Sequence, residues 1–167
     1  MAGFISGRTA RRSAPDLDFV EQKSWQNYLA TVLRMTTMLN RQLIDAHQLS
    51  LVDVHLLEIL DNAAGGTLQM GVLAEALSVP APRLTRQIKR VEGRGLVLRT
   101  VSPDDRRCVL VAITDMGRTL LEQAMITYAN QVRTHFLGQL TRPQTAAMAT
   151  SCRQIGEALK RTGGTGS

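Results

Sequence analysis

The sequence predicts a mainly α-helical protein with one small β-hairpin. Apolar residues recur at helical spacing through most of the chain, and the main change to an extended pattern lies between residues 96 and 113. The chain has 167 residues, which suits one domain, or one domain with an added helical region. Aromatic residues make up only 4% of the sequence, so Leu, Val, Ile, Ala and Met must fill the core.

The first predicted helix is long and follows a basic segment. Residues 1–15 are polar, small and basic, and we interpret them as a flexible arm. Asp16 or Asp18 can cap a helix whose apolar positions continue to about residue 48. Such a helix is longer than the roughly 8–20 residues of ordinary globular helices, and it usually packs against another chain or spans two subregions.

Three shorter helices and a hairpin are predicted next. Ser50 precedes the second helix, and after a short extended link residues 69–77 form the third. A tight turn leads to the fourth helix, residues 82–93, which begins with a proline that the first helical turn tolerates. The hairpin then consists of strands at residues 96–101 and 107–113.

The C-terminal part is predicted to be helical again. Thr114 caps a fifth helix, and residues 141–144 form a capping box that opens a sixth, which runs to about residue 160. We expect the Gly-rich tail to be disordered. The predicted organisation is an arm at 1–15, a helical region at 16–48 and 115–161, a central domain at 49–114 and a tail at 162–167.

The positive charge of the chain is concentrated between residues 83 and 107. This stretch holds eight basic and three acidic residues, and its net +5 (8 − 3) is almost the whole formal +6 of the chain. A basic surface favours a polyanionic partner, although composition alone does not separate DNA, RNA and membrane lipid. No apolar run approaches the length of a membrane-spanning helix, and residues 1–15 lack the apolar core of a secretory signal.

The fourth helix has two different faces. At 100° per residue, Leu84, Ile88 and Val91 cluster on one face. The basic and amide side chains that cluster about 120° away are Arg83, Arg86, Gln87 and Arg90. Arg can form two hydrogen bonds to guanine and Gln two to adenine. Such a helix alone could be a solvated face, but a short helix and tight turn before it and a basic hairpin after it favour a DNA-binding helix-turn-helix with a wing.

Several segments resemble the winged helix-turn-helix of MarR-type regulators. Residues 69–77, 84–86 and 91–97 resemble its helices and the Arg-Gly-Leu-Val segment. Residues 105–107, followed by 109–114, are similar to the family's wing signature, an Asp-x-Arg that closes on Leu-Thr, with Ile113 in place of the usual Leu. Gly117 fits the Leu-Thr-x-x-Gly pattern, and Ala81–Pro82 stands where the family often has small polar residues. The resemblance covers about residues 20–160.

The resemblance implies a homodimeric repressor without catalytic activity. Its terminal helices would form the dimer, and recognition helix and wing would bind double-stranded DNA at a pseudopalindromic operator, in the major and minor grooves. Arg107 would enter the minor groove, oriented by Asp105. The residues that we expect to contact DNA are Arg83, Thr85, Arg86, Gln87, Lys89, Arg90, Arg99, Arg106 and Arg107.

The resemblance also implies a pocket for an aromatic or phenolic small-molecule effector. It would lie between the dimer helices and the DNA-binding lobe. The candidate lining residues, which could equally be interfacial, are Tyr28, Arg34, His55 and Arg118.

The His and Cys residues of the sequence do not indicate a metal, catalytic or redox site. The three His residues are scattered, so we expect no metal site, and nothing indicates a cofactor or a catalytic nucleophile. Cys108 and Cys152 make no disulfide framework, which favours a reducing cytoplasm. Some relatives sense peroxide through a Cys in the first helix, where this chain has none. Two other functions remain open: sequence-independent nucleic-acid binding, as in chromosome organisation, and an interaction module that has lost DNA binding.

Overall fold

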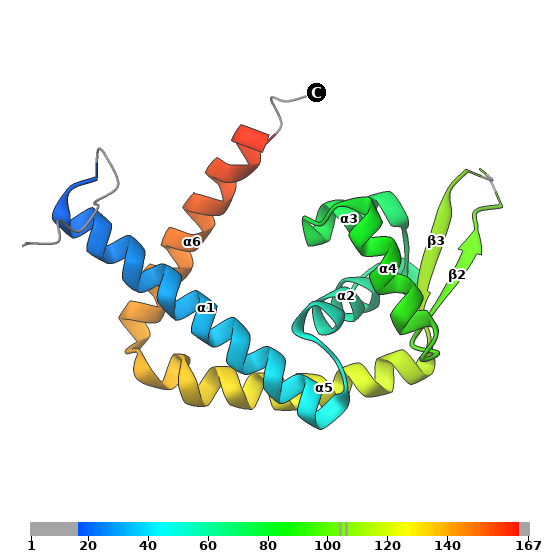
Figure 1. The fold of residues 1–167 in the computed structure, drawn as a ribbon, viewed down its shortest axis with the longest axis horizontal. Helices are drawn as coiled ribbons and strands as arrows, with labels where there is room; N and C mark the ends of the chain where they lie inside the picture. The colour runs from blue at the N-terminus through cyan, green and yellow to red at the C-terminus, as the bar shows by residue number, and fades with distance from the viewer. Residues whose placement is uncertain (1–16, 104, 106, 164–167) are drawn as a thin grey trace, which may run out of the picture. The chain divides into compact units, whose positions relative to one another are not determined.

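The computed structural model describes residues 17–103, 105 and 107–163, and it confirms the predicted fold class (Figure 1). The α-helices are α1 (Phe19–His47), α2 (Leu51–Asp61), α3 (Met70–Leu77), α4 (Ala81–Glu92), α5 (Asp115–His135) and α6 (Arg142–Gly163). The strands and short 3-10 helices are β1 (Thr67–Gln69), β2 (Val97–Val101), β3 (Val109–Ile113), η1 (Ala64–Gly66) and η2 (Leu137–Gln139). No helix within the described ranges is long and apolar enough to cross a membrane.

The chain divides into two compact units after Met38. Residues 17–38 of the first unit form most of α1. Asp18 caps this helix, because its Oδ1 accepts hydrogen bonds from the backbone N–H groups of Val20 and Glu21, at 2.7 and 2.8 Å. Several large apolar side chains of this unit are exposed, namely Phe19, Val20, Trp25, Tyr28, Leu29, Val32 and Leu33.

The second unit, from Leu39 onward, contains the hydrophobic core. Leu43 of α1 is buried there with side chains from α2, α3, α4, β2, β3 and α5. Helix α2 lies at the centre, since it contacts α3, α5, β1 and β3. The largest fully buried apolar side chains are Leu43, Leu49, Leu56, Leu57, Leu60, Leu73, Leu84, Ile88, Leu96, Val91 and Val111. Aliphatic residues therefore fill the core, as the composition predicts.

The predicted hairpin is part of a three-stranded antiparallel sheet with the order β1-β3-β2. Strand β1 pairs with β3, with Thr67 opposite Ala112 and Gln69 opposite Leu110. The extended conformation predicted for this segment is confirmed, but its pairing with β3 was not predicted. A strand of three residues is too short for an alternating pattern to show, and its partner residues on β3 lie 41 to 45 positions away in the chain.

The base of the wing is fixed to α5 by close packing. Gly95 turns the chain after α4 with φ +74°, in the left-handed region that favours glycine. Thr114 Oγ1 donates a hydrogen bond to the Gly95 carbonyl at 2.7 Å, and it accepts one from the Gly117 N–H at 3.0 Å. A Cβ at Gly117 would lie 2.2 Å from the Leu96 carbonyl oxygen. The end of α4, the β2–β3 hairpin and the start of α5 therefore meet at one closely packed junction.

Candidate nucleic-acid interface

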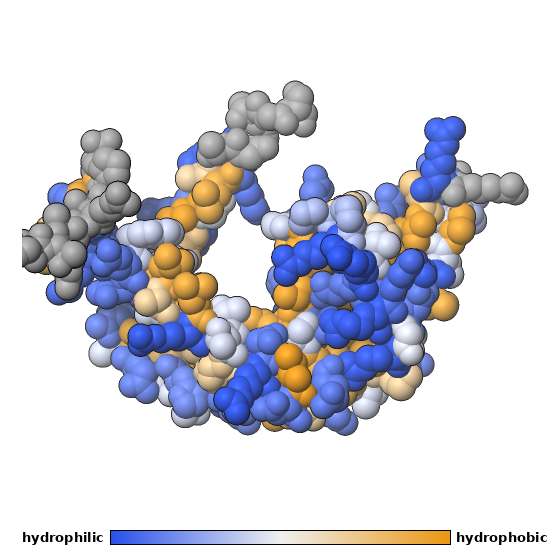
Figure 2. Space-filling model, viewed as in Figure 1, coloured by the Kyte–Doolittle hydropathy of each residue, from blue (hydrophilic) through white to orange (hydrophobic). Residues whose placement is uncertain are grey.

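Helix α4 has one buried and one exposed face. Leu84, Ile88 and Val91 are fully buried, which confirms the predicted packing face. The exposed residues of the helix include Arg83, Arg86, Lys89 and Arg90. Helix α3 packs against α4, so the two form the helix-turn-helix, and α4 begins at Ala81 after the N-cap residue Pro80. Figure 2 shows the hydrophilic surface over this part of the molecule.

Two of the predicted DNA-contacting residues bind a buried carboxylate of the same chain. Asp53, in the first turn of α2, has no exposed surface. Gln87 Nε2 donates a hydrogen bond to Asp53 Oδ1 at 3.1 Å, and the Arg90 guanidinium forms an ion pair with the same oxygen. Ser50 donates to the other oxygen, Oδ2, from its backbone N at 2.8 Å and from its hydroxyl at 2.6 Å.

The ionised form of Asp53 is stabilised by these partners. Burial alone would raise the pKa of the Asp53 carboxyl, because it disfavours the charged form. Hydrogen bonds from Arg90 and Ser50, together with the Arg90 charge, outweigh burial and hold the pKa below its ordinary value. Gln87 and Arg90 were expected to contact DNA, and Asp53 was not recognised as their partner, because they lie 34 and 37 positions from it in the chain.

A third predicted contact, Arg99 on β2, also has a carboxylate partner. Its Nε and Nη2 lie 2.8 and 2.7 Å from Glu92 Oε2 at the end of α4. The hydrogen bond from Arg99 is the main cause that lowers the pKa of Glu92. This ion pair ties the wing to the recognition helix.

Arg94 of the basic stretch caps the C-terminus of α1. Its Nη1 donates to the Gln48 carbonyl at 2.5 Å, and its Nη2 donates to the His47 carbonyl at 3.3 Å. A cation at a helix C-terminus satisfies free carbonyls and interacts favourably with the helix dipole. The segment after α4 is thus attached to the end of α1 that lies in the second unit.

The wing tip presents Arg107, whose side chain is exposed. Asp105 Oδ1 accepts a hydrogen bond from the backbone N–H of Arg107 at 2.9 Å, so Asp105 shapes the turn through the backbone. The Cys108 thiol donates to Asp105 Oδ2 at 3.3 Å, and this bond raises the pKa of Cys108, which disfavours the reactive thiolate. Arg106 lies outside the described residues.

The remaining predicted contacts differ in their partners. Thr85 donates its hydroxyl to the Ala81 carbonyl within α4 at 2.9 Å. Lys89 lies near Glu92 and helps to lower the pKa of that carboxyl. Within the described ranges, no side-chain hydrogen bond or ion pair engages Arg83, Arg86 or Arg107. These three guanidinium groups are therefore available to a ligand.

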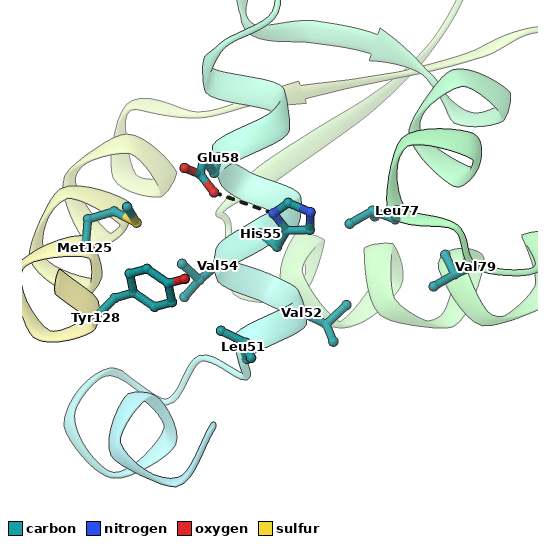
Figure 3. A pocket seen from close by; sticks show the side chains of 9 residues that line it. All are labelled: Leu51, Val52, Val54, His55, Glu58, Leu77, Val79, Met125 and Tyr128. Carbon is teal, nitrogen blue, oxygen red and sulfur yellow. Dashed lines mark hydrogen bonds and ion pairs between the residues drawn. The ribbon is translucent and has the colours of Figure 1, made fainter. Parts of the chain in front are cut away.

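An apolar pocket of about 330 Å³ lies between α2, the end of α3 and α5 (Figure 3). Its lining residues are Leu51, Val52, Val54, His55, Glu58, Leu77, Val79, Met125 and Tyr128. Of the predicted pocket residues, His55 lines it, and its Nδ1 lies 3.5 Å from Glu58 Oε2. Met125 and Tyr128 of α5 also line the pocket and were not predicted to do so; their spacing of three residues on one helix face was the available signal.

The other predicted pocket residues lie elsewhere. Arg118 forms an ion pair with Asp61, its guanidinium is close to Gly66, and it does not line this pocket. Tyr28 and Arg34 belong to the first unit, where both are exposed, and neither lines this pocket. In the part of the chain that the structure describes, no three His, Cys, Asp or Glu side chains are placed to hold a metal ion.

Comparisons with known proteins agree with this geometry. The sequence model of the MarR family matches residues 49–109. The HTH-type regulator YhbI of Bacillus subtilis is 36% identical over 64 residues, 38% of this chain and 42% of the relative. The repressor NicR of Pseudomonas putida is 29% identical over 122 residues, 73% of this chain and 75% of the relative. The chain spans less than half the length of YhbI and of two other curated relatives that it matches, whereas its match to NicR covers three quarters of that protein.

Solved structures match over most of the chain. Sco3205 of Streptomyces coelicolor, a MarR family regulator in complex with DNA, has a TM-score of 0.82 and 27% identity, over 86% of this chain and 93% of the other. AbsC, of the same organism and family, has a TM-score of 0.81 and 26% identity, over 86% of this chain and 97% of the other. Fold and matches define a winged helix-turn-helix protein. Residues 49–109 match the MarR family model, and the fold over most of the chain is that of MarR family transcriptional regulators.

Proposed function

We propose that the protein is a homodimeric repressor that binds a pseudopalindromic operator in double-stranded DNA. Helix α4 would enter the major groove, and the wing tip would reach the neighbouring minor groove. The observation that carries this proposal is the two-sided α4, whose apolar face is buried while Arg83 and Arg86 are exposed and available. The major groove admits an α-helix, and Arg is the side chain that most often reads guanine there.

The likeness to a protein solved with DNA supports this role. Sco3205, in complex with DNA, matches this chain with a TM-score of 0.82 over 86% of its length. Arg107 at the wing tip suits a narrow minor groove, whose negative potential attracts Arg. The repressor assignment follows NicR, a named repressor that aligns with 73% of this chain.

Exposed apolar side chains support the dimer. In the first unit, α1 exposes Trp25, Tyr28 and Leu33, and in the second unit α6 exposes Ile155 and Leu159. Figure 2 shows apolar side chains along α6. Large exposed apolar patches mark interaction sites, and a two-fold dimer would bring two copies of α4 to successive half-sites of a pseudopalindrome.

We also propose that a small aromatic or phenolic molecule releases the repressor from DNA. The pocket between α2 and α5 is apolar, with the Tyr128 ring and the polar His55–Glu58 pair at its wall. Its volume of about 330 Å³ falls within the range of small-molecule sites. Thermal denaturation in the presence of simple phenols tests this part, since a ligand that binds the folded state raises its melting temperature.

One binding experiment separates this proposal from its alternatives. The wild-type protein is used to select duplexes from a random library, and affinity for the selected duplex is compared with a scrambled one at fixed salt. A specific regulator binds the selected duplex at least about 10³-fold more tightly. Equal affinities would instead support a sequence-independent nucleic-acid-binding protein. Absence of salt-dependent binding to either duplex would support an interaction module.

A further inference from the structure

Asp53 is a buried charge at the contact between α2 and the recognition helix. Its two carboxylate oxygens accept hydrogen bonds from different parts of the chain. Oδ2 accepts both hydrogen bonds from Ser50 and so completes the capping box of α2, while Oδ1 accepts from Gln87 and Arg90 of α4. Each oxygen thus has two donors, which is what a fully buried carboxylate requires.

The two partners on α4 are three positions apart, so they lie on one flank of the helix. The buried face of α4 packs into the core through Leu84, Ile88 and Val91. Such apolar packing has little directional preference. The hydrogen bonds from Gln87 and Arg90 are directional, and Asp53 is itself fixed by the capping box. The carboxylate therefore sets the rotation of α4 about its axis more sharply than packing alone.

The ion pair also changes the charge that α4 presents. Arg90 is 49% exposed, so its side chain is at the surface, but its guanidinium is bound to Asp53. A paired cation contributes less to sequence-independent attraction to phosphates than a free one. The Arg90–Asp53 ion pair thus lowers the sequence-independent attraction of α4 to phosphates, which leaves base contacts a larger share of the binding.

We propose that Asp53 is a positioning residue for DNA reading, which orients α4 through Gln87 and Arg90 and withholds both side chains from DNA. This inference rests on the proposed DNA-binding function. Base-specific contacts by Arg83 and Arg86 then depend on a carboxylate that itself never touches DNA.

The first test compares cations that differ in their partners. Arg90→Gln and Arg107→Gln each remove one positive charge, and affinity for the selected and scrambled duplexes is measured over a range of salt. Arg107→Gln should reduce the slope of log affinity against log salt by about 0.9 per protomer, as for a lost phosphate contact. Arg90→Gln should leave the slope unchanged but lower the ratio of selected to scrambled affinity at least tenfold. An equal loss of slope in both variants would show that Arg90 contacts phosphate and would overturn the inference.

The second test removes the carboxylate charge. Asp53→Asn should lower the discrimination ratio at least tenfold and steepen the slope by about 0.9 per protomer, because Arg90 is released. Asp61→Asn is the matched control: it removes the same charge from an Arg pair, Asp61–Arg118, that does not involve α4. Its discrimination ratio and slope should equal those of the wild type. A folded Asp53→Asn protein with wild-type discrimination would refute the proposal.

A readout without DNA separates this inference from the proposed function. Hydrogen–deuterium exchange of the α4 amides should be faster in Asp53→Asn and Arg90→Gln than in the wild type, and unchanged in Asp61→Asn. Arg90→Gln carries the test if Asp53→Asn does not fold. If the wild-type protein selects no duplex, the proposed function is wrong, and exchange alone decides whether Asp53 positions α4. Unchanged exchange in Arg90→Gln would overturn the inference.

Discussion

The two faces of α4 should respond to mutation in opposite ways. Leu84 is fully buried and Arg86 is exposed, only two positions further along the same helix. Leu84→Ala removes buried methyl groups and leaves a cavity, which costs about 2–5 kcal/mol of the free energy of unfolding. For a chain of this size, each kcal/mol lowers the melting temperature by roughly 2–4 °C, so the expected loss is roughly 4–20 °C.

Arg86→Ala should leave stability within about 0.5 kcal/mol of the wild type, because exposed substitutions rarely change it more. If Arg86 forms two hydrogen bonds to guanine, its loss weakens binding to the selected duplex by about 1–3 kcal/mol, roughly 5- to 150-fold. Thermal denaturation at one protomer concentration and fluorescence anisotropy with labelled duplex measure the two effects. A stable Leu84→Ala protein with weakened DNA binding, or a destabilised Arg86→Ala protein, would refute the assignment of the faces.

Three further results are expected from the wing, the buried acid and α6. Arg107→Ala should weaken binding to selected and scrambled duplexes by the same factor in anisotropy titrations, since its contact is electrostatic; a changed ratio of the two affinities would contradict this. The folded-state pKa of Asp53 is lowered, so its contribution to stability is present above about pH 3.9, the unfolded value, and is lost as pH falls through the folded pKa. The free energy of unfolding should therefore fall less steeply with decreasing pH in Asp53→Asn than in the wild type. An equal fall in the two proteins would contradict the ion pair. The protein should sediment as a dimer at micromolar concentration and Leu159→Asp as a monomer, because Leu159 is exposed on α6; a wild-type monomer would argue against the proposed interface.

Local signals were sufficient to predict the helices from sequence. Asp18, Ser50, Thr114 and Thr141 each precede a helix, and each caps it through hydrogen bonds to residues two or three positions away. A cap and the apolar repeat that follows it are both encoded within a few residues, so a single sequence reveals them. The packed face of α4 was predictable for the same reason.

Long-range pairing was not predictable. Strand β1 is defined by its partner β3, and the pocket residues come together only when α2 and α5 pack. Asp53 reads in the sequence as an ordinary residue of a first helical turn. Its role requires Gln87 and Arg90, which no local pattern connects to it. Counting charges in the sequence therefore locates the basic stretch but overestimates how many of its cations are without a partner.

The salt dependence of wild-type binding provides a measure of that overestimate. The basic stretch holds eight cations per chain, but Arg90, Arg94 and Arg99 have partners in the structure. The exposed cations of α4 and the wing tip that remain among the described residues are Arg83, Arg86, Lys89 and Arg107. If each of these four and Arg106, which lies outside the described residues, releases one counterion, a dimer with two sets of five gives a slope of about −9, whereas two sets of eight give about −14. A measured slope near −14 would show that the ion pairs open on DNA, and Asp53 would then compete with phosphate for Arg90 rather than hold it.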